Sequence, residues 1–464
     1  MDALVGACHR FALLVAAAVT SMLGVTGVPA SAGTVPRIGV GLGQARPLPV
    51  HFFGVNFDYG GPSSYPMDPS IDAELAALSP GTLRWPGGNS ADTFQWQQGR
   101  PSVRAAKNFS FTLGDLASAY RATGATPVFD LNVMTSTLAD QEDMLRAASG
   151  LGLPIRYVEL GNEFYLSNAA YVKAFPTAAD YGTLVASAVV QLHRLFPGVE
   201  VAAVGSMPSK TVREKGWNQQ VLESAQGHGG LPDALTLHVY PDPLSGDLRT
   251  GKLPWLFKSA YHQEQEIRST IGSWPDAPPD GAWITEYDLR PRHPAAISNP
   301  AQTTYAGALF VAALTLMQPE ASRVRLLDFW TSLSRGLGGD WSGAGTVPKL
   351  TPAGLAQEWI ARAAAGSAGW RPLTFTGGPR LSNGDPDLIG SAFTAGAGSR
   401  EVVVNLGGGG TALAAGEAVP RGAPFRQVTG DPVVKMTAAS QLSQSSGRVG
   451  SGLTLPAYSI TLIG

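Results

Sequence analysis

The chain has 464 residues, of which 44% are hydrophobic and only 15% are charged. This composition is typical of a well-packed globular protein, and it excludes an intrinsically disordered chain and a chain made mainly of membrane-spanning segments. The net charge is −2 without any basic run, which argues against nucleic-acid binding because phosphate recognition needs a concentrated cationic face.

The first 32 residues have the pattern of a secretory signal peptide. An apolar run, FALLVAAAVTSMLGVTGV, ends on the small-residue site Ala30-Ser31-Ala32. We therefore expect cleavage after residue 32 and a mature protein that is secreted or periplasmic, without membrane contact. A membrane anchor is the alternative, and the small-residue site disfavours it. Since Cys8 is the only cysteine, the mature chain is expected to contain neither a disulfide nor a reactive thiol.

Residues 33–50 are expected to join a β-module at the other end of the chain. They contain Gly39-x-Gly41-x-Gly43, a spacing that occurs in nucleotide-binding loops. No helix can follow it, because prolines occupy positions 47 and 49. We interpret the segment as a strand that precedes the main domain.

Between residues 51 and 366, strand-like and helix-like segments alternate. The predicted strands are short apolar runs, as expected of parallel strands buried on both faces: 52–59, 81–88, 126–133, 156–163, 200–207, 234–241, 281–288 and 323–331. Helical patterns occupy 140–152, 178–198, 261–272, 304–317 and 351–366, and several start with Thr or Asp and stop at Gly. This alternation predicts a (β/α)8 TIM barrel over residues 51–366.

From residue 367 to residue 464 the composition changes. Gly, Ser, Thr and Val dominate, and short alternating segments such as REVVVNLG and LTLPAYSITLIG lie between turn signals. This pattern is typical of an all-β domain of the sandwich type. The predicted fold is thus a TIM barrel with an additional C-terminal β-sandwich.

Polar residues follow most of the predicted barrel strands. The carboxyl ends of barrel strands meet at one rim, where barrel enzymes have their active sites. The residues at these ends are Asp58-Tyr59, Gly87-Gly88-Asn89, Asn162-Glu163, His238-Val239-Tyr240, Glu286-Tyr287-Asp288 and Trp330. Six polar or aromatic strand ends at a common rim predict a site there.

Two of these residues are glutamates on strands that lie roughly opposite each other, Glu163 on the fourth and Glu286 on the seventh. Two carboxyl groups facing each other across a cleft are the minimum requirement for cleaving a glycosidic bond, and a separation of about 5 Å is the retaining geometry. We assign Glu163 as acid/base and Glu286 as nucleophile. Asn162, next to the acid/base, is expected to hydrogen-bond a sugar hydroxyl.

These strand ends resemble those of the retaining glycoside hydrolases of clan A, on the residues Gly161-Asn162-Glu163 and Thr285-Glu286-Tyr287. Within the clan, TLRWPGGNS (82–90), VELGNE (158–163) and LHVY (237–240) most resemble glycoside hydrolase family 79, the family of heparanase and of bacterial and fungal β-glucuronidases. The α-L-arabinofuranosidases of family 51 share a very similar Pro-Gly-Gly-Asn segment.

The resemblance implies roles for further residues. Asp58 and Asn89 would hold sugar hydroxyls, Tyr240 would steady the nucleophile, and Arg84 would support it from below. The loop after the last strand would read a uronate carboxylate, with Trp341 as a wall and Arg335 or Lys349 as the cation. One residue departs from the pattern of the clan: Phe164 stands where many members have Pro after the Asn-Glu pair.

Other residues have competing interpretations. Glu159 is expected to be a buried partner of Arg84 rather than a second catalytic acid, because an unpaired buried charge is costly. Asp288 is the rival nucleophile, although it lies past the strand end. His238 is expected to form a hydrogen-bonding wall. The histidines show no metal-binding spacing, so neither a metal nor another cofactor is expected.

The sequence therefore predicts an exported, retaining, exo-acting β-glucuronidase that acts on a glucuronic-acid-containing glycan or glucuronide. One alternative is another clan A glycosidase, either an α-L-arabinofuranosidase or a β-xylosidase. An endo-acting, heparanase-like enzyme is a second alternative. An inactive carbohydrate-binding protein is an alternative of a different class, and the presence of both glutamates argues against it.

Overall fold

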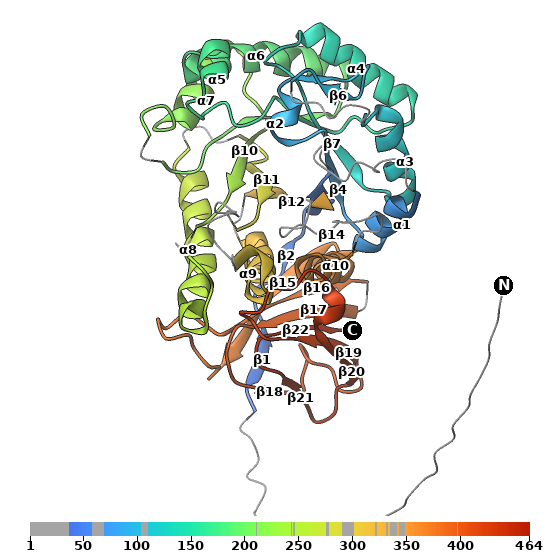
Figure 1. Ribbon diagram of the computed structural model, residues 1–464, viewed down its shortest axis with the longest axis vertical. Helices are drawn as coiled ribbons and strands as arrows, with labels where there is room; N and C mark the ends of the chain where they lie inside the picture. Colours follow the sequence, from blue (N-terminus) through green and yellow to red (C-terminus); the bar gives the residue numbers. More distant parts are fainter. Residues whose placement is uncertain are drawn as a thin grey trace, which may run out of the picture. The chain divides into compact units, whose positions relative to one another are not determined.

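Eight parallel strands close into a barrel in the computed structural model, within the described part of the chain (Figure 1). The described residues are 37–57, 69–103, 110–209, 211–242, 244, 246–274, 278–289, 301–320, 323–330, 333–334, 341–342, 349–396 and 398–464. The barrel strands are β3 (Phe53–Asn56), β4 (Thr82–Trp85), β7 (Thr126–Asp130), β8 (Tyr157–Glu159), β9 (Glu200–Val204), β10 (Ala234–Val239), β11 (Ala282–Tyr287) and β12 (Val324–Phe329). Each lies within a predicted strand range.

A long helix follows each barrel strand. The helices are α1 (Pro69–Leu78), α3 (Leu113–Thr123), α4 (Leu138–Gly150), α6 (Ala178–Leu195), α7 (Trp217–Gly227), α8 (Leu253–Gly272), α9 (Tyr305–Met317) and α10 (Pro352–Ala364). The sequence patterns identified five of them and missed α1, α3 and α7. They also placed the start of α8 at residue 261, whereas the helix begins at Leu253 with a proline in its first turn.

Threonine caps begin several of these helices, as the sequence predicted. The hydroxyl groups of Thr112, Thr137, Thr177, Thr304 and Thr351 each accept a hydrogen bond from a backbone N–H in the first turn. Such caps satisfy N–H groups that have no partner inside the helix. They fix where each helix begins, and therefore how long each loop at the rim can be.

A second, antiparallel sheet contains both ends of the described chain. Its strands run in the order β1 (Gly39–Leu42), β15 (Gly369–Thr376), β16 (Leu388–Ala395), β17 (Gly398–Asn405), β22 (Ser459–Ile463), β19 (Pro424–Thr429) and β20 (Ser443–Arg448), and β2 (Arg46–Pro47) also pairs with β15. Strands β1 and β2 precede the barrel in the sequence, so the segment before the barrel pairs with the sheet that follows it.

The middle of this sheet is buried on both faces by different partners, whereas its edge strand β20 is exposed. Along β17, Val402 and Val404 belong to the same core as the barrel helices, whereas Val403 packs with Leu413 and Leu455 of the small sheet formed by β18 (Thr411–Ala414) and β21 (Gly452–Leu455). Side chains alternate between the faces of a strand, so consecutive valines serve both cores. Helices α9 and α10 contact the sheet strands, and Arg37–Gly464 form one compact unit.

The remaining described elements are short and lie in loops. They are the helices α2 (Gly88–Ala91) and α5 (Ala169–Ala174) and the paired segments β5 (Phe94–Gln95) with β6 (Arg100–Pro101) and β13 (Leu333–Ser334) with β14 (Trp341–Ser342). Single turns of 3-10 helix are η1 (Thr250–Lys252), η2 (Ala301–Thr303), η3 (Gln318–Glu320) and η4 (Ala439–Gln441). Within the described ranges, no helix combines the length and the apolar character needed to cross a bilayer. The predicted signal peptide, residues 1–32, lies outside the described residues.

Candidate active site

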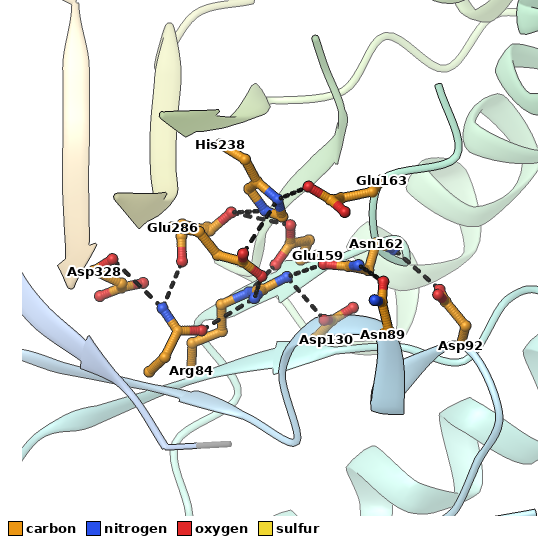
Figure 2. Close-up of polar contacts among 12 residues, drawn as sticks. Arg84, Asn89, Asp92, Asp130, Glu159, Asn162, Glu163, His238, Glu286 and Asp328 are labelled. Atoms are coloured by element: carbon orange, nitrogen blue, oxygen red, sulfur yellow. Dashed lines mark hydrogen bonds and ion pairs between the residues drawn. The ribbon is translucent and has the colours of Figure 1, made fainter. Parts of the chain in front are cut away.

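Arg84 forms the floor of the site at the end of β4 (Figure 2). Its side chain is fully buried, and all its N–H groups point at oxygen acceptors. Its hydrogen bonds are 2.6 Å to Glu159 Oε2, 2.7 Å to Glu286 Oε1, 2.9 Å to Asp130 Oδ2, 3.0 Å to Asn56 Oδ1 and 3.0 Å to Asn162 Oδ1. One guanidinium group therefore links β3, β4, β7, β8, β11 and the loop that follows β8.

The floor holds more carboxyl groups than cations. Asp130 and Glu159 are paired in register on β7 and β8, and both contact Arg84. Burial raises the pKa of Asp130 well above its usual value against the opposing effect of Arg84, and its Oδ1 has no hydrogen-bond partner in the described part of the site. Arg84 is therefore the cation that Asp130, Glu159 and Glu286 share.

Glu286 is held through both carboxylate oxygens. Oε1 accepts from Arg84 at 2.7 Å, and Oε2 accepts from the Tyr240 hydroxyl at 2.6 Å. The parallel pairing of β10 with β11 places His238 directly beside Glu286, after a bulge between Leu237 and His238. A carboxyl group that accepts on both oxygens is fixed in position and suited to the ionised form.

Glu163 lies in an irregular loop rather than in a strand. Strand β8 ends at Glu159, so the predicted strand 156–163 is too long. Gly161 has φ +89°, and a Cβ there would lie 2.3 Å from the Phe164 ring. Glu163 itself has φ +50°, in the left-handed region that non-glycine residues rarely occupy. This turn lifts the Glu163 carboxylate from the strand end to the rim.

Phe164, the residue that departs from the clan pattern, anchors this loop. Its ring is fully buried and contacts the rings of Tyr171, Phe175 and Tyr181 at centroid distances of 5.4, 4.8 and 5.4 Å. Aromatic packing of this kind supplies a large buried surface. It supports the strained backbone at Glu163 from below.

One oxygen of Glu163 receives two hydrogen bonds. Oε1 lies 2.9 Å from the Tyr165 hydroxyl and 3.0 Å from His238 Nδ1, and Oε2 has no partner among the described residues. His238 Nδ1 also lies 3.5 Å from Glu286 Oε2. Oxygens of Glu163 and Glu286 and a nitrogen of His238 all lie within 4.8 Å of one another. The two carboxyl groups are thus close to the retaining separation of about 5 Å.

A hydrogen-bonded chain fixes the orientation of the His238 ring. The Thr285 hydroxyl donates to Glu159 Oε1 at 3.1 Å, so its oxygen is free to accept from His238 Nε2 at 3.2 Å. Nδ1 then faces the carboxyl groups of Glu163 and Glu286. His238 could also contribute to a cation site with Glu163 and Glu286, but Arg84 and Tyr240 already occupy both oxygens of Glu286 and disfavour an added cation.

The electrostatics of the two glutamates differ in the substrate-free site. Burial raises the pKa of Glu286, although His238 and Arg84 oppose this effect. Burial also acts to raise the pKa of Glu163. The hydrogen bonds from His238 and Tyr165 and the charge of His238 outweigh this effect, so the pKa of Glu163 is lowered. Burial acts to lower the pKa of His238, yet the neighbouring Glu286 and Glu163 carboxylates raise it. These directions favour an imidazolium between the two carboxylates.

The structure brings together most, but not all, of the predicted site residues. Glu163, Glu286, Asn162, His238, Tyr240 and Arg84 form one connected network, and Glu159 pairs with Arg84 as expected. Asn89 joins it through Asn162 Nδ2, at 3.1 Å. Asn162 is only 1% exposed, and its side-chain amide makes hydrogen bonds to the protein residues Arg84 and Asn89. Its contact with a sugar hydroxyl stays a prediction.

Other predicted residues lie apart from the network or outside the described residues. The Asp288 carboxyl is buried, accepting from the Leu289 backbone N–H and from Gln302, and it touches neither glutamate. Asp58, Arg335 and the Trp341 side chain lie outside the described residues, and Lys349 lies in a loop just before α10.

Several site residues were missed at the sequence level. Asp130 ends β7 and could have been found by the strand-end rule that found the glutamates. Thr285 directly precedes Glu286, and the resemblance to clan A implies no role for it. Tyr165, Tyr171 and Asp92 lie in loops or in short helix α5, and no local sequence signal marks them.

Comparisons with known proteins support a glycosidase-like fold. No family model matches the chain. An exo-α-(1→6)-L-arabinofuranosidase from Bifidobacterium longum is 27% identical over 190 residues, which represent 35% of this chain and 35% of that protein. The match therefore spans about a third of the length of that relative.

Solved structures match over nearly the whole chain. An α-L-arabinofuranosidase from Thermotoga maritima in complex with arabinose has a TM-score of 0.69 and 17% identity, covering 92% of this chain and 99% of that one. A 4-O-α-L-rhamnosyl-β-D-glucuronidase from Fusarium oxysporum in complex with Rha-GlcA has a TM-score of 0.61 and 12% identity, covering 92% and 100%. The predicted barrel with an additional β-domain is confirmed. The assignment to family 79 stays a prediction, because both activities occur among the similar structures.

Proposed function

We propose that the chain is a retaining glycosidase that removes a terminal α-L-arabinofuranosyl group. The observation that carries the reaction type is the pair of carboxyl groups, Glu163 and Glu286, whose oxygens lie within 4.8 Å. At this separation no room remains for a water molecule behind the sugar, so one carboxylate must itself attack. This geometry favours a double displacement over an inverting reaction.

In the first step, the Glu286 carboxylate forms a bond to the anomeric carbon while the bond from that carbon to the leaving oxygen breaks. Glu163 gives its proton to the leaving oxygen. In the second step, water attacks the anomeric carbon, its proton passes to Glu163, and Glu286 leaves as a carboxylate. The product keeps the anomeric configuration of the substrate.

The contacts of the two glutamates support this division of roles. Both oxygens of Glu286 accept hydrogen bonds from Arg84 and Tyr240, which stabilises the ionised nucleophile. Glu163 uses only Oε1 within the described site, so Oε2 can carry the proton. The lowered pKa of Glu163 belongs to the substrate-free site; a bound sugar would bury the carboxyl further and oppose this effect.

Two findings support an arabinofuranosyl substrate. The curated relative and the Thermotoga maritima structure are both arabinofuranosidases, and the structure contains arabinose. In addition, the cations that contact the glutamates in the described site, Arg84 and His238, are already engaged by protein carboxylates. A neutral sugar needs no further cation, whereas a uronate carboxylate does.

A β-glucuronidase is the second candidate. The motifs TLRWPGGNS, VELGNE and LHVY support it, as does the Fusarium oxysporum enzyme, which is a glucuronidase of similar fold. Its carboxylate-binding candidate, Arg335, lies outside the described residues. A glucuronide substrate would require a cation from that loop.

A panel of p-nitrophenyl glycosides separates the two candidates. We expect turnover of the α-L-arabinofuranoside to exceed that of the β-D-glucuronide and the β-D-xyloside, and we expect Glu286→Gln to abolish it. Preferred turnover of the glucuronide would overturn the arabinofuranosidase proposal in favour of the second candidate. Turnover of none of the three would contradict both.

Azide tests the division of roles between the glutamates. Glu163→Ala should be partly rescued by azide or by an activated leaving group, giving an azido-sugar of retained configuration. An inverted azido-sugar from this variant would mean that Glu163 is the nucleophile.

A further inference from the structure

A closed ring of hydrogen bonds lies beside the catalytic pair, and its members are Asn89, Asp92, Asn162 and Tyr171 (Figure 2 shows the first three). Asn162 Nδ2 lies 3.1 Å from Asn89 Oδ1, which lies 3.1 Å from the Tyr171 hydroxyl. That hydroxyl lies 2.6 Å from Asp92 Oδ2, and Asp92 Oδ1 accepts from the Asn162 backbone N–H at 3.3 Å. The ring therefore holds the residue that immediately precedes Glu163.

The orientation of both amides in the ring is fixed from outside it. Arg84 can only donate, so the Asn162 atom 3.0 Å from its Nη2 must be the oxygen. Asn162 consequently presents its NH2 group to Asn89. The Asn89 atom that receives this N–H must also be the oxygen, because two NH2 groups would repel each other.

The Tyr171 hydroxyl has one proton and lies near two oxygens, Asn89 Oδ1 and Asp92 Oδ2. If Asp92 were ionised, the proton would point at it, and the Tyr171 and Asn89 oxygens would face each other without a hydrogen. If Asp92 is protonated, it donates to Tyr171, and Tyr171 donates to Asn89. Only the second arrangement gives every contact in the ring a proton.

We propose that Asp92 is a protonated positioning residue, which donates a hydrogen bond to Tyr171 and so holds Asn89 with its NH2 group free. Asn89 is exposed at the rim, and its Nδ2 has no partner among the described residues. That group can donate to a sugar hydroxyl. The contact of Asn89 with a sugar hydroxyl rests on the proposed glycosidase function. The protonation state of Asp92 does not depend on that function.

Burial and charge around Asp92 agree with this state. Asp92 is only 2% exposed, and burial raises its pKa to about 8, although the hydrogen bonds from Tyr171 and Asn162 oppose this. The negative charge of Glu163 acts in the same direction as burial, and Arg84 acts against it. Asp130, from β7, is the other carboxyl group that interacts with Asp92. Asp92 should therefore lose its proton as the pH rises through about 8.

Substitutions at the ring distinguish a donor from an acceptor. In Asp92→Asn the amide can still donate to Tyr171, so we expect kcat/KM at neutral pH to stay within about threefold of wild type. The wild type should lose activity near pH 8 beyond the loss caused by the two glutamates, and Asp92→Asn should not show this additional loss. Asp92→Ala and Tyr171→Phe should each lose about tenfold, the usual effect of one hydrogen bond, mainly through KM. Asp143→Asn, an exposed change on α4, serves as the control.

Infrared difference spectroscopy tests the proton without relying on activity. Glu401, whose pKa burial raises to about 7, also loses its proton in this range, so the test compares the two proteins. Between about pH 6 and about pH 10 the wild type should lose the carbonyl band of one more protonated carboxylic acid than Asp92→Asn does. Wild-type and variant spectra that do not differ, together with equal losses in Asp92→Asn and Asp92→Ala, would show an ionised acceptor and overturn the proposal. Failure of the proposed function would appear separately, as an absence of glycoside turnover.

Discussion

Arg84 is the residue on which the site geometry depends most, because its guanidinium group orients Glu286, the amide of Asn162 beside Glu163, and two further buried carboxyl groups. Arg and Lys differ at such a position. The three N–H donors of Lys all belong to one nitrogen, whereas the five N–H donors of Arg are spread over the three nitrogens of a planar group. No lysine side chain can reproduce contacts that reach residues on opposite sides of the barrel.

Arg84→Lys should therefore destabilise the protein by about 3–5 kcal/mol, the usual cost of leaving buried charges without partners, and should reduce kcat. Urea denaturation and steady-state kinetics measure the two effects. Arg146→Lys is the matched control, because Arg146 is half exposed on α4 in its ion pairs with Glu142 and Asp143. A cost below about 1 kcal/mol for Arg84→Lys would contradict the role of the guanidinium group.

His238 couples the ionisation of the two glutamates. It lowers the pKa of both Glu163 and Glu286, so His238→Gln should raise both. Both limbs of the pH profile of kcat/KM arise from this pair of carboxyl groups, because the reaction needs one of them ionised and the other protonated. Both limbs should therefore move to higher pH, whereas the exposed control His262→Gln should leave them unchanged. Limbs that stay in place would contradict the coupling.

At the residue scale, the sequence predicted the contacts that follow from strand ends but not those made by loops. Glu163, Glu286, Arg84 and Tyr240 were found because a barrel brings the ends of its strands together. Asp92 was not found, since its partner Tyr171 lies 79 positions further along the chain. Nothing in the local sequence indicates that the two side chains meet.

At the scale of elements, the loop from β8 to α5 decides where the Glu163 carboxyl group lies. Gly161 permits a turn that places the chain against the Phe164 ring, and Glu163 then adopts a left-handed conformation. Hydrophobic periodicity located β8 correctly but could not show where the strand ends. The segment VELGNE is compatible with a strand, and only the contact between Gly161 and the Phe164 ring explains why the chain turns there. The helices α1, α3 and α7 were missed at the same level.

Gly161→Ala tests this loop. A Cβ would lie 2.3 Å from the Phe164 ring and would also strain the backbone at φ +89°. Gly152→Ala is the matched control, because Gly152 has φ +82° but no atom within 4 Å of the added Cβ. Gly152→Ala should cost about 1 kcal/mol of unfolding free energy, and Gly161→Ala about 1–3 kcal/mol more, with a loss of kcat. Equal costs would mean that the Phe164 contact is unimportant.

At the scale of the whole molecule, the barrel and the C-terminal sheet share one core across α9 and α10. The sequence predicted both parts from their different patterns, alternating strands and helices in one and short strands in the other. It could not show their common core, because a pattern reports which face of an element is apolar but not which partner covers it. Figure 1 shows these helices beside the sheet.

The buried Glu401 of this sheet makes stability depend on pH. Burial raises its pKa to about 7, and the Ser399 hydroxyl opposes this. In the unfolded chain the pKa of a glutamate is about 4.3. The folded state therefore keeps a proton that the unfolded state has lost, and stability falls as the pH rises from about 4 to about 7.

Glu401→Gln should remove this dependence. Urea denaturation should show that the variant gains unfolding free energy relative to wild type between about pH 5 and about pH 8. Glu417→Gln, whose side chain is 80% exposed, is the control. A constant difference between Glu401→Gln and wild type would contradict the raised pKa.

Covalent labelling tests the central claim, a double displacement through Glu286, most directly. An arabinofuranose-configured mechanism-based inactivator should add one glycosyl group to the peptide that contains Glu286, as measured by mass spectrometry of the digested protein. Glu163→Gln should still be labelled by an inactivator with an activated leaving group, and Glu286→Gln should not. A label on Glu163 or Asp288, or no label with either the arabinofuranose- or the glucuronate-configured reagent, would contradict the mechanism.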